Sequence, residues 1–174
     1  MEERTELIQR LRTQRPANWD QLPDFSLYMD QVLAYIDRQI IRFDEEDCLT
    51  AAMVNNYTKS GLVPRAEGKR YGPVHLGYLT AVCALKKVLP VRSVGALLSA
   101  GQQADKGERG LYEYFCRALD RALTETAQTI DGDAKREDLA RMALDLALRS
   151  YANQLACARI LDILNPEETK KTKK

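Results

Sequence analysis

Apolar residues recur at helical spacing along most of the chain, and this spacing predicts an all-α fold. Helices are expected over residues 2–14, 26–42, 50–60, 73–88, 91–98, 111–130 and 134–164. No segment of more than a few residues alternates apolar and polar side chains in the manner of a half-buried strand. The sequence therefore leaves room for a two-stranded wing at most, in the loop between the third and fourth helices.

Local signals mark the ends of the two central helices. Thr50 is suited to cap the helix over 50–60, and Gly61 stands where a left-handed residue ends a helix. Pro64 prevents that helix from resuming, and Pro73 fits the first turn of the next helix. A short loop is therefore expected between the two helices.

Positive charge is concentrated in this central region. The chain of 174 residues has a formal net charge of +1, but residues 49–100 hold seven basic residues and one acidic residue. Asymmetry of this kind can mark a surface that faces a polyanion. Any such surface is local, because the chain as a whole is not strongly basic.

The sequence offers no catalytic or metal-binding constellation. The four cysteines are dispersed, and the one histidine, His75, is expected to have a surface or capping role. A zinc site would need a cluster of Cys or His ligands at short spacing, and the usual phosphate-binding and hydrolase motifs are absent. We therefore expect reduced, mostly buried thiols, no metal, no cofactor and no enzymatic activity. Without an apolar run long enough for a membrane span, or a secretory signal, the expected location is cytoplasmic.

The last expected helix carries a broad apolar stripe. Its members are Leu144, Leu148, Tyr151, Leu155 and Ala158, widened by Leu139, Met142 and Leu146. With the helix over 111–130 and a turn at 131–133, this helix is expected to form an antiparallel hairpin. Three interpretations of the stripe remain open: packing on the same chain, a homodimer interface, or a ligand pocket.

The order of residues through the central region resembles the winged-helix DNA-binding domain of MerR-type transcription regulators. In that family a tyrosine-bearing recognition helix ends in Gly-Leu, and a short wing with an arginine and a tyrosine leads into the next helix. Tyr57, Gly61 and Leu62 match the end of the helix, and Arg70 and Tyr71 match the end of the wing. The resemblance extends over the central region and implies a winged helix-turn-helix.

A longer pattern resembles a bacterial family of small proteins described as a domain of unknown function (DUF1836-like). It consists of LPDFSLYMDQVLAYI, LTAAMVNNYTKSGLVP and KRYGPVHLGYL, and covers roughly residues 22–98. This resemblance implies the same MerR-like DNA-binding fold, and it implies no particular reaction or target.

The resemblance implies a DNA-binding surface made of a recognition helix at about 50–60 and a basic wing at 65–71. The major groove admits an α-helix whose asparagines can bond adenine edges, and basic side chains position a protein by contacting phosphates. The candidate DNA-binding residues are Asn55, Asn56, Tyr57, Lys59, Arg65, Lys69, Arg70 and Tyr71. The alternatives are core packing for the tyrosines, a solvated helix face for the asparagines and ordinary solubility for the basic residues.

The chain differs from the MerR pattern at two places. Asn55 stands where that family has an arginine, and Asn56 stands where it has an aromatic residue. An acidic run at 44–47, expected to be an exposed loop, would repel phosphate if it lay beside the recognition helix. The position of this run therefore bears on whether the surface binds DNA.

The sequence predicts an all-α protein with a MerR-like winged helix-turn-helix and a C-terminal antiparallel helical hairpin. The expected parts are an N-terminal helix and linker at 1–21, the winged domain at 22–100, the hairpin at 105–165 and a disordered basic tail at 166–174. We expect the protein to bind duplex DNA as a transcription regulator, and to dimerise through its C-terminal helices. The alternative is a protein-interaction module that uses the same scaffold to hold an acidic partner without binding DNA.

Overall fold

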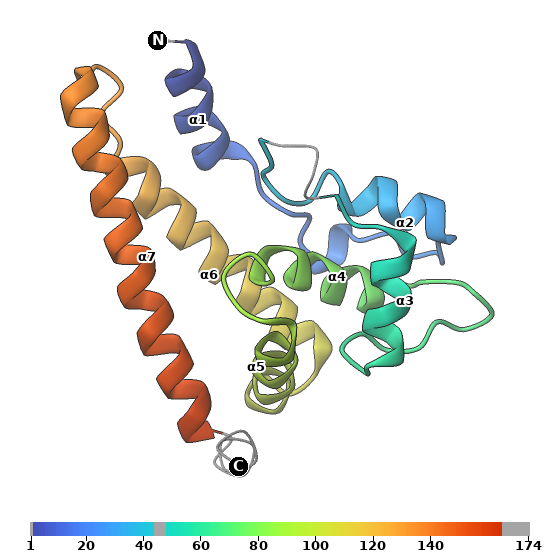
Figure 1. The fold of residues 1–174 in the computed structure, drawn as a ribbon. Helices are drawn as coiled ribbons and strands as arrows, with labels where there is room; N and C mark the ends of the chain where they lie inside the picture. Colours follow the sequence, from blue (N-terminus) through green and yellow to red (C-terminus); the bar gives the residue numbers. More distant parts are fainter. Residues whose placement is uncertain (1, 44–47, 165–174) are drawn as a thin grey trace.

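The fold is all-helical over the residues that the computed structural model describes, 2–43 and 48–164, which confirms the predicted class (Figure 1). The elements are α1 (Glu2–Thr13), the 3-10 turn η1 (Trp19–Gln21), α2 (Met29–Ile36), α3 (Ala51–Lys59), α4 (Pro73–Leu85), α5 (Val91–Ala104), α6 (Glu108–Gln128) and α7 (Arg136–Leu164). The acidic run at 44–47 and the tail expected at 166–174 lie outside the described residues.

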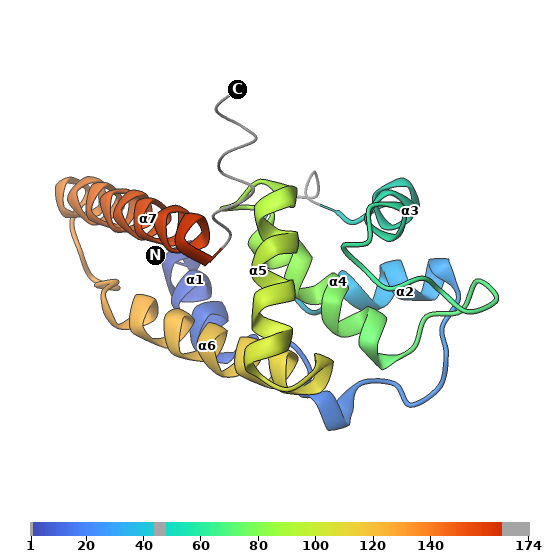
Figure 2. The ribbon, with the colours of Figure 1, turned by 90° about the horizontal axis from the view of Figure 1, so that it is seen from below.

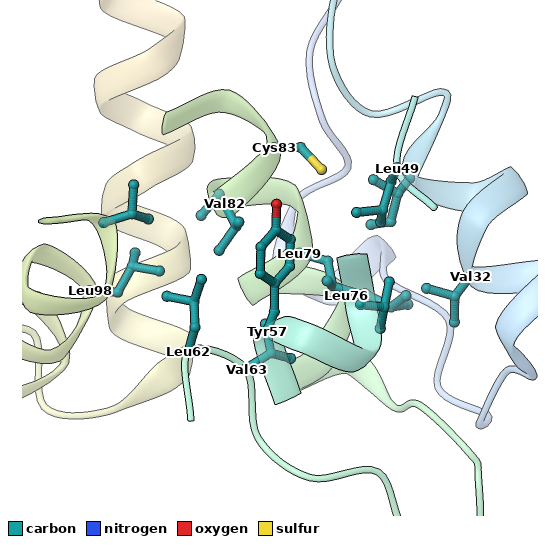
Figure 3. Close-up of a cluster of buried hydrophobic side chains, with 14 of the residues drawn as sticks. Val32, Leu49, Tyr57, Leu62, Val63, Leu76, Leu79, Val82, Cys83 and Leu98 are labelled. Atoms are coloured by element: carbon teal, nitrogen blue, oxygen red, sulfur yellow. The ribbon is translucent and has the colours of Figure 1, made fainter. Parts of the chain in front are cut away.

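Helix α4 lies at the centre of the core. It is apolar around most of its circumference, which is the pattern of a helix that is covered on all sides. Helices α2, α5 and α6 pack on it, and α3 packs on α2. Figure 3 shows apolar side chains of α2, α3, α4 and α5 converging on one cluster. The buried residues of α4 are Leu76, Gly77, Leu79, Thr80, Ala81, Val82 and Cys83.

The N-terminal segment lies along α6. Helix α1 packs on α6, and the hydroxyl of Tyr112 donates to the carbonyl of Ala17 at 2.8 Å. The ring of Trp19 packs against Tyr112, with 6.0 Å between the centroids. Leu22 is buried. Trp19 and Leu22 thus hold the N-terminal segment against the core.

The helix predicted over 26–42 is wrong at both ends, because α2 spans only Met29–Ile36. Its N-cap is Tyr28. The late start has a cause that the local sequence does not signal. Leu27 exchanges two backbone hydrogen bonds of 2.9 Å with Tyr71, which keeps the chain extended just before the helix.

The segment 99–110, which lies between two of the predicted helices, is mostly helical. Helix α5 continues through Gly101 to Ala104, and Gly110 lies within α6. The chain reverses over a short link, in which Lys106 and Gly107 have positive φ angles of 59° and 123°. Gly101 and Gly110 therefore lie within helices and do not end them.

The predicted C-terminal hairpin is open. Helix α6 packs on α1, α4 and α5, whereas the principal contact of α7 is with α5. Figures 1 and 2 show α7 along one edge of the molecule, on the side opposite α3. Leu144, Leu148, Tyr151 and Leu155 are exposed, so packing on the same chain is wrong for this part of the stripe, whereas Leu139, Met142 and Leu146 are half-buried.

Only one of the four cysteines is buried. Cys83 lies in the core, where burial raises the pKa of its thiol, but Cys48 is exposed and the other two are half-buried. The expectation of mostly buried thiols is therefore wrong. Within residues 2–43 and 48–164, no group of His, Cys, Asp or Glu is placed to hold a metal ion. None of the helices in these ranges is long and apolar enough to cross a membrane.

Candidate nucleic-acid interface

Helix α3 buries one side and exposes a polar side. Val54 and Tyr57 are buried in the core. The exposed positions are Ala52, Asn55, Asn56 and Lys59. At 100° per residue these positions span an arc of about 100°. Asn55 and Asn56 stand toward opposite sides of this arc, and no acidic residue of α3 lies within it.

The two ends of α3 are held as the sequence predicts. The hydroxyl of Thr50 accepts a backbone N–H of the first turn at 3.2 Å, and Gly61 has a φ of 76° just beyond the last turn. The backbone N–H of Leu62 then donates to the carbonyl of Tyr57 at 2.9 Å, and its side chain is buried. The chain that leaves α3 toward the wing is therefore anchored in the core.

The loop after α3, residues 65–72, which we call the wing, is closed by a tight turn. The backbone N–H of Arg70 donates to the carbonyl of Glu67 at 3.0 Å, and the two residues between them have positive φ angles, 55° at Gly68 and 64° at Lys69. Two positive φ angles in succession define the type I′ turn that is favoured in hairpins. Tyr71 then pairs with Leu27, which ties the end of the wing to the start of α2.

His75 joins the two ends of the wing. Its Nδ1 accepts the backbone N–H of Gly72 at 3.0 Å, and its Nε2 lies 3.2 Å from the carbonyl of Arg65. The ring also meets Tyr71 edge-on, with 5.4 Å between the centroids. Because Nδ1 accepts, the neutral ring carries its proton on Nε2 and donates to Arg65. The capping role expected for His75 is confirmed at the start of α4.

Replacing His75 with Ala is expected to loosen the wing. Both side-chain hydrogen bonds disappear, and the free energy of unfolding should fall by about 1–2 kcal/mol. Amide hydrogen exchange should become faster at residues 65–72 and stay unchanged in α6. Equal exchange in the wing of the two proteins would contradict the role given to His75.

The basic candidates gather on the wing and on the exposed side of α3. Lys59, Arg65, Lys69 and Arg70 are all exposed. Figure 1 shows the wing projecting from the body beside α3. The structure thus brings all four basic candidates to one end of the molecule.

Tyr28 is a residue of this surface that the sequence analysis missed. The guanidinium of Arg70 lies 5.4 Å from the centre of its ring, and one guanidinium nitrogen donates to its hydroxyl at 3.2 Å. Contacts of a cation with an aromatic face are favourable even at exposed sites. The aromatic pair Phe25 and Tyr28, just before α2, is the available signal, and both residues are exposed. A helix over 26–42 would instead place Tyr28 within its first turn.

Tyr57 and Tyr71 do not belong to this surface. Their exposed fractions are 7% and 5%, and both are members of the main core cluster. Figure 3 shows the ring of Tyr57 pointing from α3 into the core toward Cys83. Burial raises the pKa of its hydroxyl. Core packing, the alternative left open for both tyrosines, is therefore what the structure shows.

A protein-family model matches the part of the chain that forms this surface. A family model described as "Domain of unknown function (DUF1836)" matches residues 17–115, which is more than half of the chain. The match covers α2, α3, the wing, α4 and α5 and ends within α6. No curated protein and no solved structure shows significant similarity to the chain.

Proposed function

The chain belongs to the DUF1836 family of domains of unknown function, and on this premise we propose that it binds duplex DNA through α3 and the wing, as a regulator of transcription. The observation that carries the proposal is the pairing of two features. One is the capped helix α3, whose exposed arc holds Asn55, Asn56 and Lys59. The other is an anchored basic turn with Lys69 and Arg70 at its tip.

The chemistry of the two features is complementary. An α-helix fits the major groove, where an asparagine side chain can bond both the N6 and N7 positions of adenine. Lys59 and the wing would contact phosphates on either side of the groove and fix the position of the helix. Because Asn55 and Asn56 point about 100° apart, one of them at a time would read a base. The proposal assigns no base contact to Tyr57 or Tyr71.

The arrangement of the surrounding elements supports a winged helix-turn-helix. Helix α2 precedes and contacts α3, and the wing follows α3 and leads into α4. The wing is held at both ends by backbone pairing and by His75. A wing that is ordered before binding loses less conformational entropy when it contacts DNA. On this view the MerR-like domain consists of α2, α3, the wing and α4.

Binding to random-sequence duplex DNA tests the proposal. Fluorescence anisotropy at a series of salt concentrations should give an affinity that falls steeply as salt increases, because bound cations are released from the phosphates. Replacing both Lys69 and Arg70 with Ala should weaken binding. It should also reduce the slope of log K against log salt by about 2, one for each phosphate contact removed.

A matched variant separates wing contacts from general charge. Lys135 and Arg136 are exposed at the start of α7, so their double Ala variant removes the same charge from another part of the surface. Its salt slope should equal that of the unchanged protein. Equal weakening in both double variants would reduce the effect to net charge, and absence of binding at low salt would overturn the proposal in favour of a protein-interaction module.

A further inference from the structure

Helix α7 carries a row of large apolar side chains that its own chain leaves in solvent. The exposed fractions are 59% for Leu144, 55% for Leu148, 61% for Tyr151 and 56% for Leu155. The spacing of these residues is four, three and four, which is the a/d spacing of a coiled coil. At 100° per residue they lie within an arc of about 60°. We call these four residues the α7 seam.

The seam is separate from the side on which α7 packs. The more buried apolar residues of the helix are Leu139, Met142, Leu146, Cys157 and Leu161. Around the helix axis they cluster on the side opposite the seam. This explains the broad stripe seen in the sequence, since one helix carries two apolar faces. The inner face is used within the chain, and the outer face is not.

We propose that the α7 seam binds the α7 seam of a second copy of this chain, with the two helices antiparallel. A heptad-spaced seam on a helix of 29 residues is the self-complementary surface that a two-fold interface requires. An antiparallel pair centred between Leu148 and Tyr151 brings Leu144 opposite Leu155 of the second copy. All four seam residues of each copy are then covered.

The charges beside the seam favour the antiparallel direction. In that arrangement Asp138 lies near Arg159 of the second copy, in addition to the ion pairs that these two residues make within their own helix with Arg141 and Asp162. Opposite charges at such flanking positions help to set the orientation of a helix pair. In a parallel pair, Arg141 would face Arg141 and Asp162 would face Asp162, and like charges would repel. When the helices run in opposite directions, neither Arg141 nor Asp162 faces its own copy.

Sedimentation velocity of the full chain without DNA tests this proposal. The expected result is a dimer with twice the 19.7 kDa chain mass, dissociating on dilution. Leu155→Glu should raise the dissociation constant by about 100-fold or more, because the two-fold axis introduces each charge twice into the apolar seam. A wild-type chain that stays monomeric at every concentration would overturn the proposal, as would binding of some other partner to the seam of a monomer.

Ile160 provides the matched control. It has the same exposed fraction as Leu155, 56%, but lies about 140° away around the helix, outside the seam. Ile160→Glu should therefore dimerise as the unchanged protein does. Circular dichroism of both variants establishes that α7 remains folded. Equal loss of the dimer in the two variants would overturn the assignment of the seam.

Charge reversal tests the direction of the pair. Asp138→Arg and Arg159→Asp should each weaken the dimer, because each places like charges near one another across the antiparallel pair. The double variant restores the opposite charges across the pair and should bind more tightly than either single variant. Circular dichroism should show α7 still helical without the ion pairs of Asp138 with Arg141 and of Arg159 with Asp162. Additive losses in the double variant would overturn the antiparallel arrangement. These measurements contain no DNA, so they hold or fail independently of the proposed function.

Discussion

Replacing Gly110 with Ala is expected to lower the free energy of unfolding by about 3 kcal/mol, an unusually large effect for adding one methyl group. A Cβ at this position would lie well inside van der Waals contact with the backbone carbonyl oxygen of Asp105. It would also come within 3.1 Å of the carbonyl carbon of that residue. Backbone atoms cannot rotate away as a flexible side chain can, so the tight link from α5 to α6 would have to open.

Gly95→Ala is the matched control, with the opposite expected sign. Gly95 lies within α5, and the nearest atom to an added Cβ is a methyl of Leu62 at 3.5 Å, an ordinary contact. Since alanine is favoured over glycine within a helix, this change should stabilise the protein by about 0.5–1 kcal/mol. Urea denaturation of the three proteins measures the difference. A Gly110→Ala variant as stable as Gly95→Ala would contradict the close approach of the two helices.

The same link shows where sequence reasoning reaches its limit. Gly61 and Gly110 look alike in the sequence, but Gly61 ends a helix with a positive φ, whereas Gly110 lies in the first turn of α6, where the backbone carbonyl of Asp105 leaves no room for a Cβ. The first role follows from neighbouring residues, and α3 and the start of α4 were therefore predicted closely. The second role depends on the sharp reversal through Lys106 and Gly107, whose positive φ angles bring the carbonyl of Asp105 against Gly110. For this reason the helix predicted over 91–98 ends too early and the helix predicted over 111–130 begins too late.

The candidate surface could be predicted only where local sequence signals determine it. The exposed asparagines and basic residues follow from helical periodicity and from the loop signals around Pro64 and Pro73. The start of α2 does not, because a backbone pairing with Tyr71 sets it from a distance of more than forty positions along the chain. Because the start of α2 was predicted too early, Tyr28 was not recognised as part of the surface. The two apolar faces of α7 are visible in the sequence, but which of them is covered depends on how α5 and α7 meet.

Tyr57 can separate the core of the protein from its surface chemistry. Its exposed fraction is 7%, and its ring fills the space between α3 and α4 (Figure 3). Tyr57→Ala should lower the free energy of unfolding by about 3–5 kcal/mol, the range for removing a large buried aromatic side chain. Such a loss would also abolish DNA binding, because an unfolded α3 presents no surface. The Ala variant alone therefore cannot distinguish the two roles.

Tyr57→Phe makes the distinction. It keeps the ring in the core and removes only the hydroxyl, so the free energy of unfolding should change by no more than about 1 kcal/mol. A hydroxyl that contacts phosphate would contribute to affinity, whereas a hydroxyl directed into the core toward Cys83 would not. We expect the affinity for duplex DNA and its salt dependence to be those of the unchanged protein. Weaker binding by a fully folded Phe variant would indicate that the Tyr57 hydroxyl contacts DNA. It would contradict the orientation of the ring toward the core.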